Sequence, residues 1–288
     1  MTGMTNFLIR KATQSDFEQV IKWADNEGWN PGLDDLTIFY QTDPDGFLVG
    51  VLDDQIIASI SVVKYNPAYG FLGFYIANQN YRGQGYGLEI WKRGIQYLDG
   101  ATIGLDGVVD QQDNYITSGF QFFGRNIRYS GIPKPSNIQN INVTTRPIIE
   151  NDYIWMSSLD RDCFGCDRQS FLRNWTGSQD PTRHTLAVHK DAKPCGFGTI
   201  RKCSSSYKIG PLFSTDLDAA NTLFKALCEL IPINSEVTLD VPEYNPKAIE
   251  LAKNSSLKPI FETARMYRGT PPPIDWQKVF GVTTLELG

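Results

Sequence analysis

A glycine-rich turn is the stretch of this sequence whose residue types are best suited to chemistry. Arg82-Gly-Gln-Gly-Tyr-Gly87 follows an apolar, aromatic run at residues 71–77 and precedes residues with helical spacing from Tyr86 onward. Glycines let backbone N–H groups approach an anion without a Cβ in the way. The first turn of a helix offers unpaired donors and the positive end of its dipole, and a guanidinium suits phosphate oxygens. Residues 82–87, here named the glycine turn, are therefore predicted to bind a phosphate.

The same pattern also fits a tight strand–helix connection that binds nothing. Two familiar phosphate motifs are excluded. No Gly-Lys-Ser/Thr follows, as a P-loop requires, and the third glycine comes too soon for the dinucleotide fingerprint. The elements around the turn must decide between the remaining alternatives.

The first half of the chain predicts the order β-α-α-β-β-β-α-β-α-β. Strands are expected at residues 7–9, 47–52, 56–65, 71–77, 102–109 and 120–129, and helices after residue 13 and over 34–40, 86–99 and 113–118. Hairpins followed by a strand–helix–strand crossover predict a mixed sheet, with residues 71–77 and 102–109 parallel. The glycine turn would then lie at the carboxyl end of a sheet strand, where open α/β sheets bind ligands.

The loop at residues 25–32 is a second candidate for binding. It is rich in turn-forming residues yet carries Glu27, Trp29 and Asn30. A large aromatic beside polar groups is typical of a binding loop. The loop could equally be a helix cap in which Trp29 has only a packing role.

Taken together, these elements resemble the GNAT acyltransferase superfamily over roughly residues 7–130. Its signature, Arg/Gln-x-x-Gly-x-Gly/Ala, is matched by Arg82, Gly85 and Gly87. These enzymes often carry a Tyr four residues before a Gly-Phe pair, as Tyr115 stands before Gly119-Phe120. Residues 27–32 and 280–288 look like those of bacterial two-lobed, or tandem, GNAT proteins.

The resemblance implies acetyl-CoA as co-substrate, with its diphosphate on the glycine turn and its pantetheine arm along the preceding strand. The residues that it assigns to the cofactor are Tyr75, Ile76, Ala77, Arg82, Gly83, Gln84, Gly85, Tyr86, Gly87 and Leu88. Two positions depart from the family pattern: Val108 stands where many members have Asn, and Gln79 where Pro is usual. The first departure removes a side-chain contact to the cofactor.

The implied reaction is direct attack of an amine on the thioester. Tyr115 would protonate the departing thiolate, since a tyrosine pKa of about 10 lies close to a thiol's of about 8.5. The first half contains no His, so an imidazole base is excluded there. Glu27 could act as base through water, bind a cationic substrate or cap a helix, and Trp29 and Asn30 would shape the acceptor pocket.

The second half repeats the plan of the first. Strands are expected at residues 142–148, 184–189, 195–202 and 207–213, helices around 153–159 and over 216–230, and residues 236–241, 246–253 and 259–268 close the repeat. In place of the glycine turn stands Gly210-Pro-Leu-Phe-Ser-Thr-Asp-Leu-Asp218, whose two acids would repel a phosphate. The expected fold is therefore α/β with a mixed sheet, built from two tandem GNAT-like domains of which the second is degenerate.

The expected domain boundaries follow from this repeat. They are a GNAT domain with the acetyl-CoA site at residues 1–132, a linker at 133–141, a second GNAT-like domain at 142–270 and a C-terminal tail at 271–288 that packs back on the body.

Composition limits the function. A net charge of −5 gives no support to a nucleic-acid partner, and no apolar run approaches the length of a membrane span. Five cysteines without a secretory signal indicate the cytoplasm. Cys163-Phe-Gly-Cys166 has metal-like spacing, but no second pair or nearby His completes four ligands, so no metal is expected.

We therefore expect an N-acetyltransferase that moves an acetyl group from acetyl-CoA to the amine of a small molecule or peptide. An amino acid, a polyamine, an aminoglycoside, a peptide terminus or a protein lysine would each fit. The alternative is a non-catalytic protein that binds or senses acyl-CoA or a small molecule on a GNAT scaffold, because a fold does not fix its chemistry.

Overall fold

The computed structural model describes residues 6–134 and 142–288, here called the first and second halves. In the first half the observed elements confirm the predicted order. They are β1 (Phe7–Lys11), α1 (Gln14–Asn26), α2 (Asp35–Thr42), β2 (Phe47–Leu52), β3 (Gln55–Asn66), β4 (Tyr69–Ala77), α3 (Tyr86–Tyr97), β5 (Thr102–Val108), α4 (Gln112–Thr117) and β6 (Gln121–Gly131). Most of the predicted linker, residues 135–141, lies outside the described residues.

The second half follows the same plan with one helix that the sequence prediction missed. Its elements are β7 (Val143–Pro147), α5 (Tyr153–Phe164), α6 (Gln169–Thr176), β8 (Arg183–Lys190), β9 (Lys193–Lys202), β10 (Tyr207–Ser214), α7 (Leu217–Cys228), β11 (Val237–Pro242), α8 (Pro246–Asn254), β12 (Lys258–Arg268) and β13 (Val279–Gly281). The missed helix, α6, buries Phe171, Leu172 and Trp175 on one face. The helical spacing of these apolar residues is the signal in the sequence that could have identified this helix.

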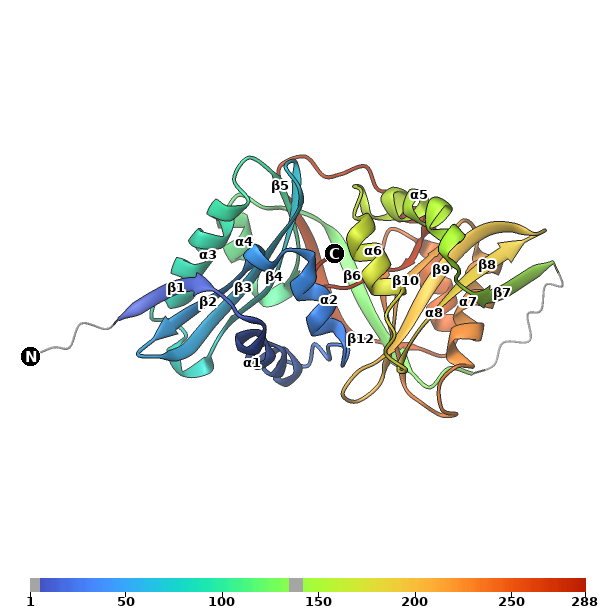
Figure 1. The fold of residues 1–288 in the computed structure, drawn as a ribbon, viewed down its shortest axis with the longest axis horizontal. Coiled ribbons are helices and arrows are strands. Elements are labelled where there is room, and N and C mark those ends of the chain that lie inside the picture. The colour runs from blue at the N-terminus through green and yellow to red at the C-terminus, as the bar shows by residue number, and fades with distance from the viewer. Residues whose placement is uncertain (1–5, 135–141) are drawn as a thin grey trace, which may run out of the picture.

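All the described strands join in one mixed sheet, with the order β1-β2-β3-β4-β5-β12-β6-β11-β10-β9-β8-β7 and β13 beside β10. The crossover through α3 makes β4 and β5 parallel, as predicted. Figure 1 shows the two halves side by side, with β6 and β12 in the middle.

The two halves exchange their last long strands. β12 of the second half pairs with β5 of the first, and β6 of the first half pairs with β11 of the second. β6 and β12 also pair with each other. Neither half therefore completes its sheet with its own residues alone, and the sheet is continuous through the exchange.

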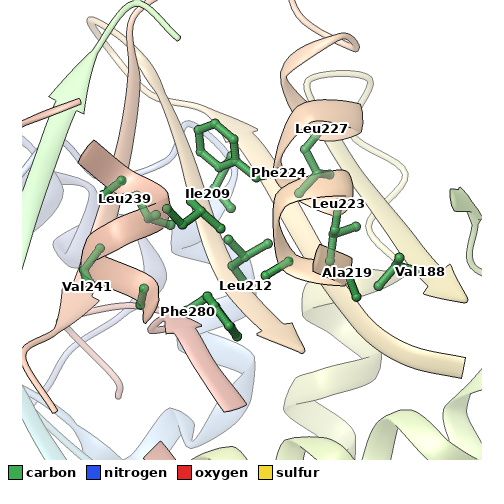
Figure 2. Close-up of a cluster of buried hydrophobic side chains, with 14 of the residues drawn as sticks. Val188, Ile209, Leu212, Ala219, Leu223, Phe224, Leu227, Leu239, Val241 and Phe280 are labelled. Atoms are coloured by element: carbon green, nitrogen blue, oxygen red, sulfur yellow. The ribbon is translucent and has the colours of Figure 1, made fainter. Parts of the chain in front are cut away.

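The core of the second half receives a side chain from the end of the chain. Val188, Ile209, Leu212, Leu223, Leu227 and Leu239 form a buried cluster between the sheet and α7, and Phe280 of β13 lies among them (Figure 2). After β13, residues 282–288, here named the tail segment, are all buried. The chain ends between the two halves (Figure 1).

Candidate active site

A cavity of about 590 Å³ lies beside β4 and the glycine turn. Its first wall is residues 72–77 of β4, the second is residues 105–108 of β5, and glycines of the glycine turn lie at one end. Residues of β6, β12 and the tail segment complete it. The strand exchange and the tail segment therefore both contribute to a cavity whose frame belongs to the first half.

The two strand walls diverge within the sheet. β4 and β5 are paired only from Tyr69 with Thr102 to Leu72 with Leu105, although they continue to Ala77 and Val108. Their unpaired ends face the cavity. Unpaired strand edges can hydrogen-bond an extended ligand as an added strand would.

A bulge in β4 sharpens this opening. The register with β3 shifts between Ser59 and Ser61, and Phe74 on the opposite strand adopts φ +44°. Ser59 Oγ donates a hydrogen bond of 2.9 Å to the carbonyl of Phe74. A bulky residue with positive φ is uncommon and costs free energy, so its surroundings must hold it in place.

The glycine turn leaves backbone donors directed at the cavity end. Gly83 and Gly85 have φ of +75° and +92°, values that suit glycine, with no atom within 4 Å of where a Cβ would stand. Gly85 is the N-cap of α3, whose hydrogen bonds begin with Glu89 N–H to the Gly85 carbonyl. The N–H groups of Tyr86, Gly87 and Leu88 therefore have no acceptor within the helix. The turn is open, and its donors suit an anion such as a diphosphate.

Arg82 and Glu27, predicted for separate roles, are partners. Arg82 Nη2 lies 2.5 Å from Glu27 Oε1, and its Nε donates a hydrogen bond of 2.9 Å to the carbonyl of Ala77. Both side chains remain partly exposed, at 48% and 35%. The pair lines the cavity next to the glycine turn, so a bound phosphate would compete with Glu27 for the guanidinium.

Tyr115 lines the same cavity from α4. Its ring stacks on Trp91 at 5.4 Å between centroids and fills the space that a Cβ on Gly107 would need. Among the described residues its hydroxyl has no hydrogen-bond partner. Burial, and then the nearby Tyr75, raises the pKa of Tyr115 above its usual range. The hydroxyl is thus protonated at neutral pH, the state that a general acid needs.

The loop after α1 contacts both the exchanged strand β6 and the second half. The carbonyl of Trp29 accepts hydrogen bonds from Arg128 Nη1 at 2.9 Å and Lys208 Nζ at 3.1 Å, and Trp29 also lines the cavity. Asn30, predicted to shape the acceptor pocket, is instead placed away from the cavity lining. Its amide donates to Ser206 Oγ at 2.8 Å, so it joins the two halves.

Several lining residues were missed by sequence reasoning: Arg128, Phe261, Thr263, Leu285 and Glu286. They reach the cavity through the strand exchange or the tail segment. No local motif around them indicates a ligand, because their position depends on pairing between strands far apart in the sequence.

In the second half, β13 fills the opening that corresponds to the one between β4 and β5. β10 and β11 are parallel and paired only over residues 207–209 and 237–239, after which β13 pairs with β10. The N–H of Val282 then donates to the carbonyl of Asp240 at 2.9 Å. At the start of α7, the carboxylate of Asp216 accepts from the Ala219 N–H at 3.0 Å. The helix start and the strand opening thus have partners within the chain.

Two features are absent from residues 6–134 and 142–288. No helix among them combines the length and apolar character needed to cross a bilayer. Nor do they bring together three or more His, Cys, Asp or Glu side chains in an arrangement that could hold a metal ion.

Comparison with known proteins agrees with this architecture. Residues 10–114 match the acetyltransferase (GNAT) family, and residues 156–281 match an acetyltransferase (GNAT) domain. The chain is 31% identical over 284 residues to the holothin acyltransferase of Pseudoalteromonas sp. (strain SANK 73390), covering 97% of this chain and 94% of that protein.

Solved structures share the fold at lower identity. A putative acetyltransferase from Pyrococcus horikoshii has a TM-score of 0.82 at 22% identity, over 99% of this chain and 97% of that one. A tandem GNAT protein from the clavulanic acid biosynthesis pathway has a TM-score of 0.63 at 11% identity, over 92% and 100%. With two GNAT domains in sequence and in structure, the chain belongs to the tandem GNAT proteins, members of a superfamily of N-acyltransferases that use acyl-CoA.

Proposed function

We propose that the protein transfers an acyl group, acetyl in the first instance, from acyl-CoA to the amine of a small molecule. The observation that carries the proposal is that an open glycine turn, a strand opening and a buried tyrosine hydroxyl line one cavity. Acyl-CoA would supply the activated thioester. The unpaired N–H groups at the start of α3 suit its diphosphate, and the unpaired edge of β4 suits its extended arm.

Each part of the cavity has a separate task in this proposal. N–H groups of residues 86–88 and the guanidinium of Arg82 hold the diphosphate. Backbone N–H groups beside the bulge at Phe74 polarise the thioester carbonyl, as an oxyanion hole does. Tyr115 gives its proton to the sulfur as the carbon–nitrogen bond forms and the carbon–sulfur bond breaks.

We further propose that the second half binds no acyl-CoA. β13 occupies its strand opening, and Asp216 places a carboxylate at the start of α7. A titration should therefore give one bound acyl-CoA per chain.

Calorimetric titration with acetyl-CoA tests binding, and mass spectrometry of acylated product tests transfer. Holothin is the first acceptor to try, because a relative at 31% identity is named for it. Gly87→Val should abolish binding, since an added Cβ would lie 3.0 Å from the Tyr75 hydroxyl and the side chain would stand at the open turn. Lys92→Val, an exposed position on the same helix, is the matched control.

Failure of acetyl-CoA to bind, or equal affinities in both variants, would refute the proposed site. Binding without transfer to any amine in a broad panel would instead favour a protein that senses acyl-CoA. If acetyl-CoA is bound but another acyl-CoA is turned over faster, the acyl group in the proposal changes and the reaction class stays.

A further inference from the structure

Glu286 of the tail segment is a buried carboxylate without a partner. The residue is only 4% exposed and lines the cavity. Within residues 6–134 and 142–288 its side chain makes no hydrogen bond and no ion pair. A buried carboxylate normally has such partners, because its desolvation is costly.

The cations around Glu286 bind other groups, although Nη2 of Arg201 has no partner among the described residues. Arg128 binds Asp240 with two hydrogen bonds of 2.7 and 2.9 Å, and Arg201 Nε donates to Asp35 at 3.1 Å. Lys208 donates to the carbonyl of Trp29. Burial, and then Arg128, lowers the pKa of Lys208, and the charge of Glu286 opposes this shift. The charge of Glu286 therefore acts on these three cations, but its carboxylate oxygens make no hydrogen bond within the described residues.

The backbone at Glu286 and Leu287 is held by specific contacts. Its carbonyl packs against Gly73 of β4, where any side chain would collide with it. Leu287 N–H donates to Thr284 Oγ1 at 2.8 Å, and the Tyr65 hydroxyl donates to the Leu287 carbonyl at 2.8 Å. The packing of its own carbonyl and the two hydrogen bonds of Leu287 thus hold Glu286 at the cavity, as a binding group requires.

Aromatic and apolar groups surround this end of the cavity. Trp29 and Phe74 lie 6.3 Å apart between ring centroids, and Phe261 and Leu285 contribute further apolar surface. Thr263 has a hydroxyl without a partner in the described chain. A carboxylate among aromatic side chains suits an ammonium group on a flat, apolar framework.

We propose that Glu286 is the acceptor-binding residue: it pairs with the ammonium group of the incoming substrate and takes a proton from it. This inference rests on the proposed acyl transfer. The neutral amine then attacks the thioester carbon, and Tyr115 protonates the departing sulfur. The proton shed by the new amide nitrogen restores Tyr115, and Glu286 releases its own proton to solvent, so the reaction balances.

The position of Glu286 separates it from Glu27. Glu27 is tied to Arg82 beside the glycine turn, whereas Glu286 enters from the tail segment, with Trp29 and Phe261 as co-lining residues. In this proposal a residue of the second half takes a direct part in the reaction that the first half carries out.

The test uses benzylamine and its neutral analogue benzyl alcohol as probes, titrated into the full chain saturated with CoA and followed by ligand-observed NMR. Wild-type protein should prefer benzylamine by about tenfold or more, one charged hydrogen bond's worth. In Glu286→Gln the preference should vanish, and Glu286→Asp should restore part of it. Glu250→Gln, an exposed position on α8, should behave as wild type.

Two other measurements make the result unambiguous. Thermal unfolding and CoA titration should be unchanged in Glu286→Gln, which shows that the variant folds and keeps its glycine turn. Equal benzylamine preference in wild type and Glu286→Gln, or no preference in wild type, would overturn the role of Glu286. If the wild-type chain does not bind CoA, that result would count against the proposed function instead.

Discussion

Arg265 and Asp106 face each other across β12 and β5 and form a doubly hydrogen-bonded ion pair, with Nε–Oδ1 at 2.8 Å and Nη2–Oδ2 at 2.6 Å. The two residues come from opposite halves of the chain and are 3% and 0% exposed. Arg128 and Asp240 repeat the arrangement across β6 and β11. One arginine–aspartate pair thus holds each exchanged strand in its register.

Breaking the first of these pairs should destabilise the protein strongly. Arg265→Met leaves Asp106 buried without its cation, which costs about 3–5 kcal/mol. Urea unfolding measures the loss. Lys11→Met, which breaks an exposed pair with Asp45, should cost less than about 1 kcal/mol.

The double variant Arg265→Met/Asp106→Leu should recover most of that stability, because it removes the orphaned charge as well. A double variant as unstable as the single one would show that the arginine acts through packing and not through its charge.

Arg82 and Glu27 should have opposite effects on CoA binding. Arg82→Ala should weaken it by about 10- to 150-fold, the value of one charged hydrogen-bonding group. Glu27→Gln should strengthen it by up to about fivefold, because it frees the guanidinium and removes a negative charge beside the diphosphate. Calorimetric titration gives both affinities. Weaker binding in Glu27→Gln would mean that the carboxylate holds Arg82 in its productive position.

Tyr115→Phe should separate catalysis from binding. The hydroxyl has no partner among the described residues, and phenylalanine keeps the stack on Trp91, so neither folding nor CoA affinity should change. If Tyr115 is the acid, kcat should fall by about 100-fold or more. Release of free thiol during acyl transfer reports the rate. Undiminished turnover would assign the proton to water.

Stability should fall in acid partly through Asp16. Hydrogen bonds from Arg10 lower the pKa of Asp16 to about 2, although burial opposes the shift, and the Thr13 backbone and side chain assist. The folded-state pKa lies below the unfolded value of 3.8, so this contribution is complete above about pH 5 and is lost progressively as the pH falls towards 2 and below. Urea unfolding of Asp16→Asn between pH 6 and pH 2 should show a shallower decline than wild type. Parallel curves would contradict the assignment.

The sequence predicted the first half well because its boundaries carry local signals. Thr13 and Asp16 form the capping box of α1, and the positive φ angles at Gly83 and Gly85 require the residue type found there. Such features act over a few residues, so one sequence is enough to detect them. Tyr115 lines the same cavity as the glycine turn, and its role as the acid stays a prediction.

The strand exchange left no local signal. β6 and β12 occupy the same place in the repeat, and either would satisfy the alternation of its neighbours. The choice depends on partners more than 100 positions away, such as Arg128 with Asp240. Glu286 was missed for a related reason: nothing in an apolar tail indicates that it runs between two domains. The sequence places Asn30 in a pocket because its hydrogen bond to Ser206, between β9 and β10, depends on residues far away in the chain.

The exchange has a consequence for how the protein can be divided, in the laboratory or in evolution. Expressed alone, either half would lack a central strand and would expose the unpaired edge of β5 or β11. Such an edge can pair with another chain and promotes aggregation. A hinge motion that separated the halves would have to break the pairing of β5 with β12 and of β6 with β11. The two halves therefore form one structural unit, and a cut between them would leave each without a strand that it needs.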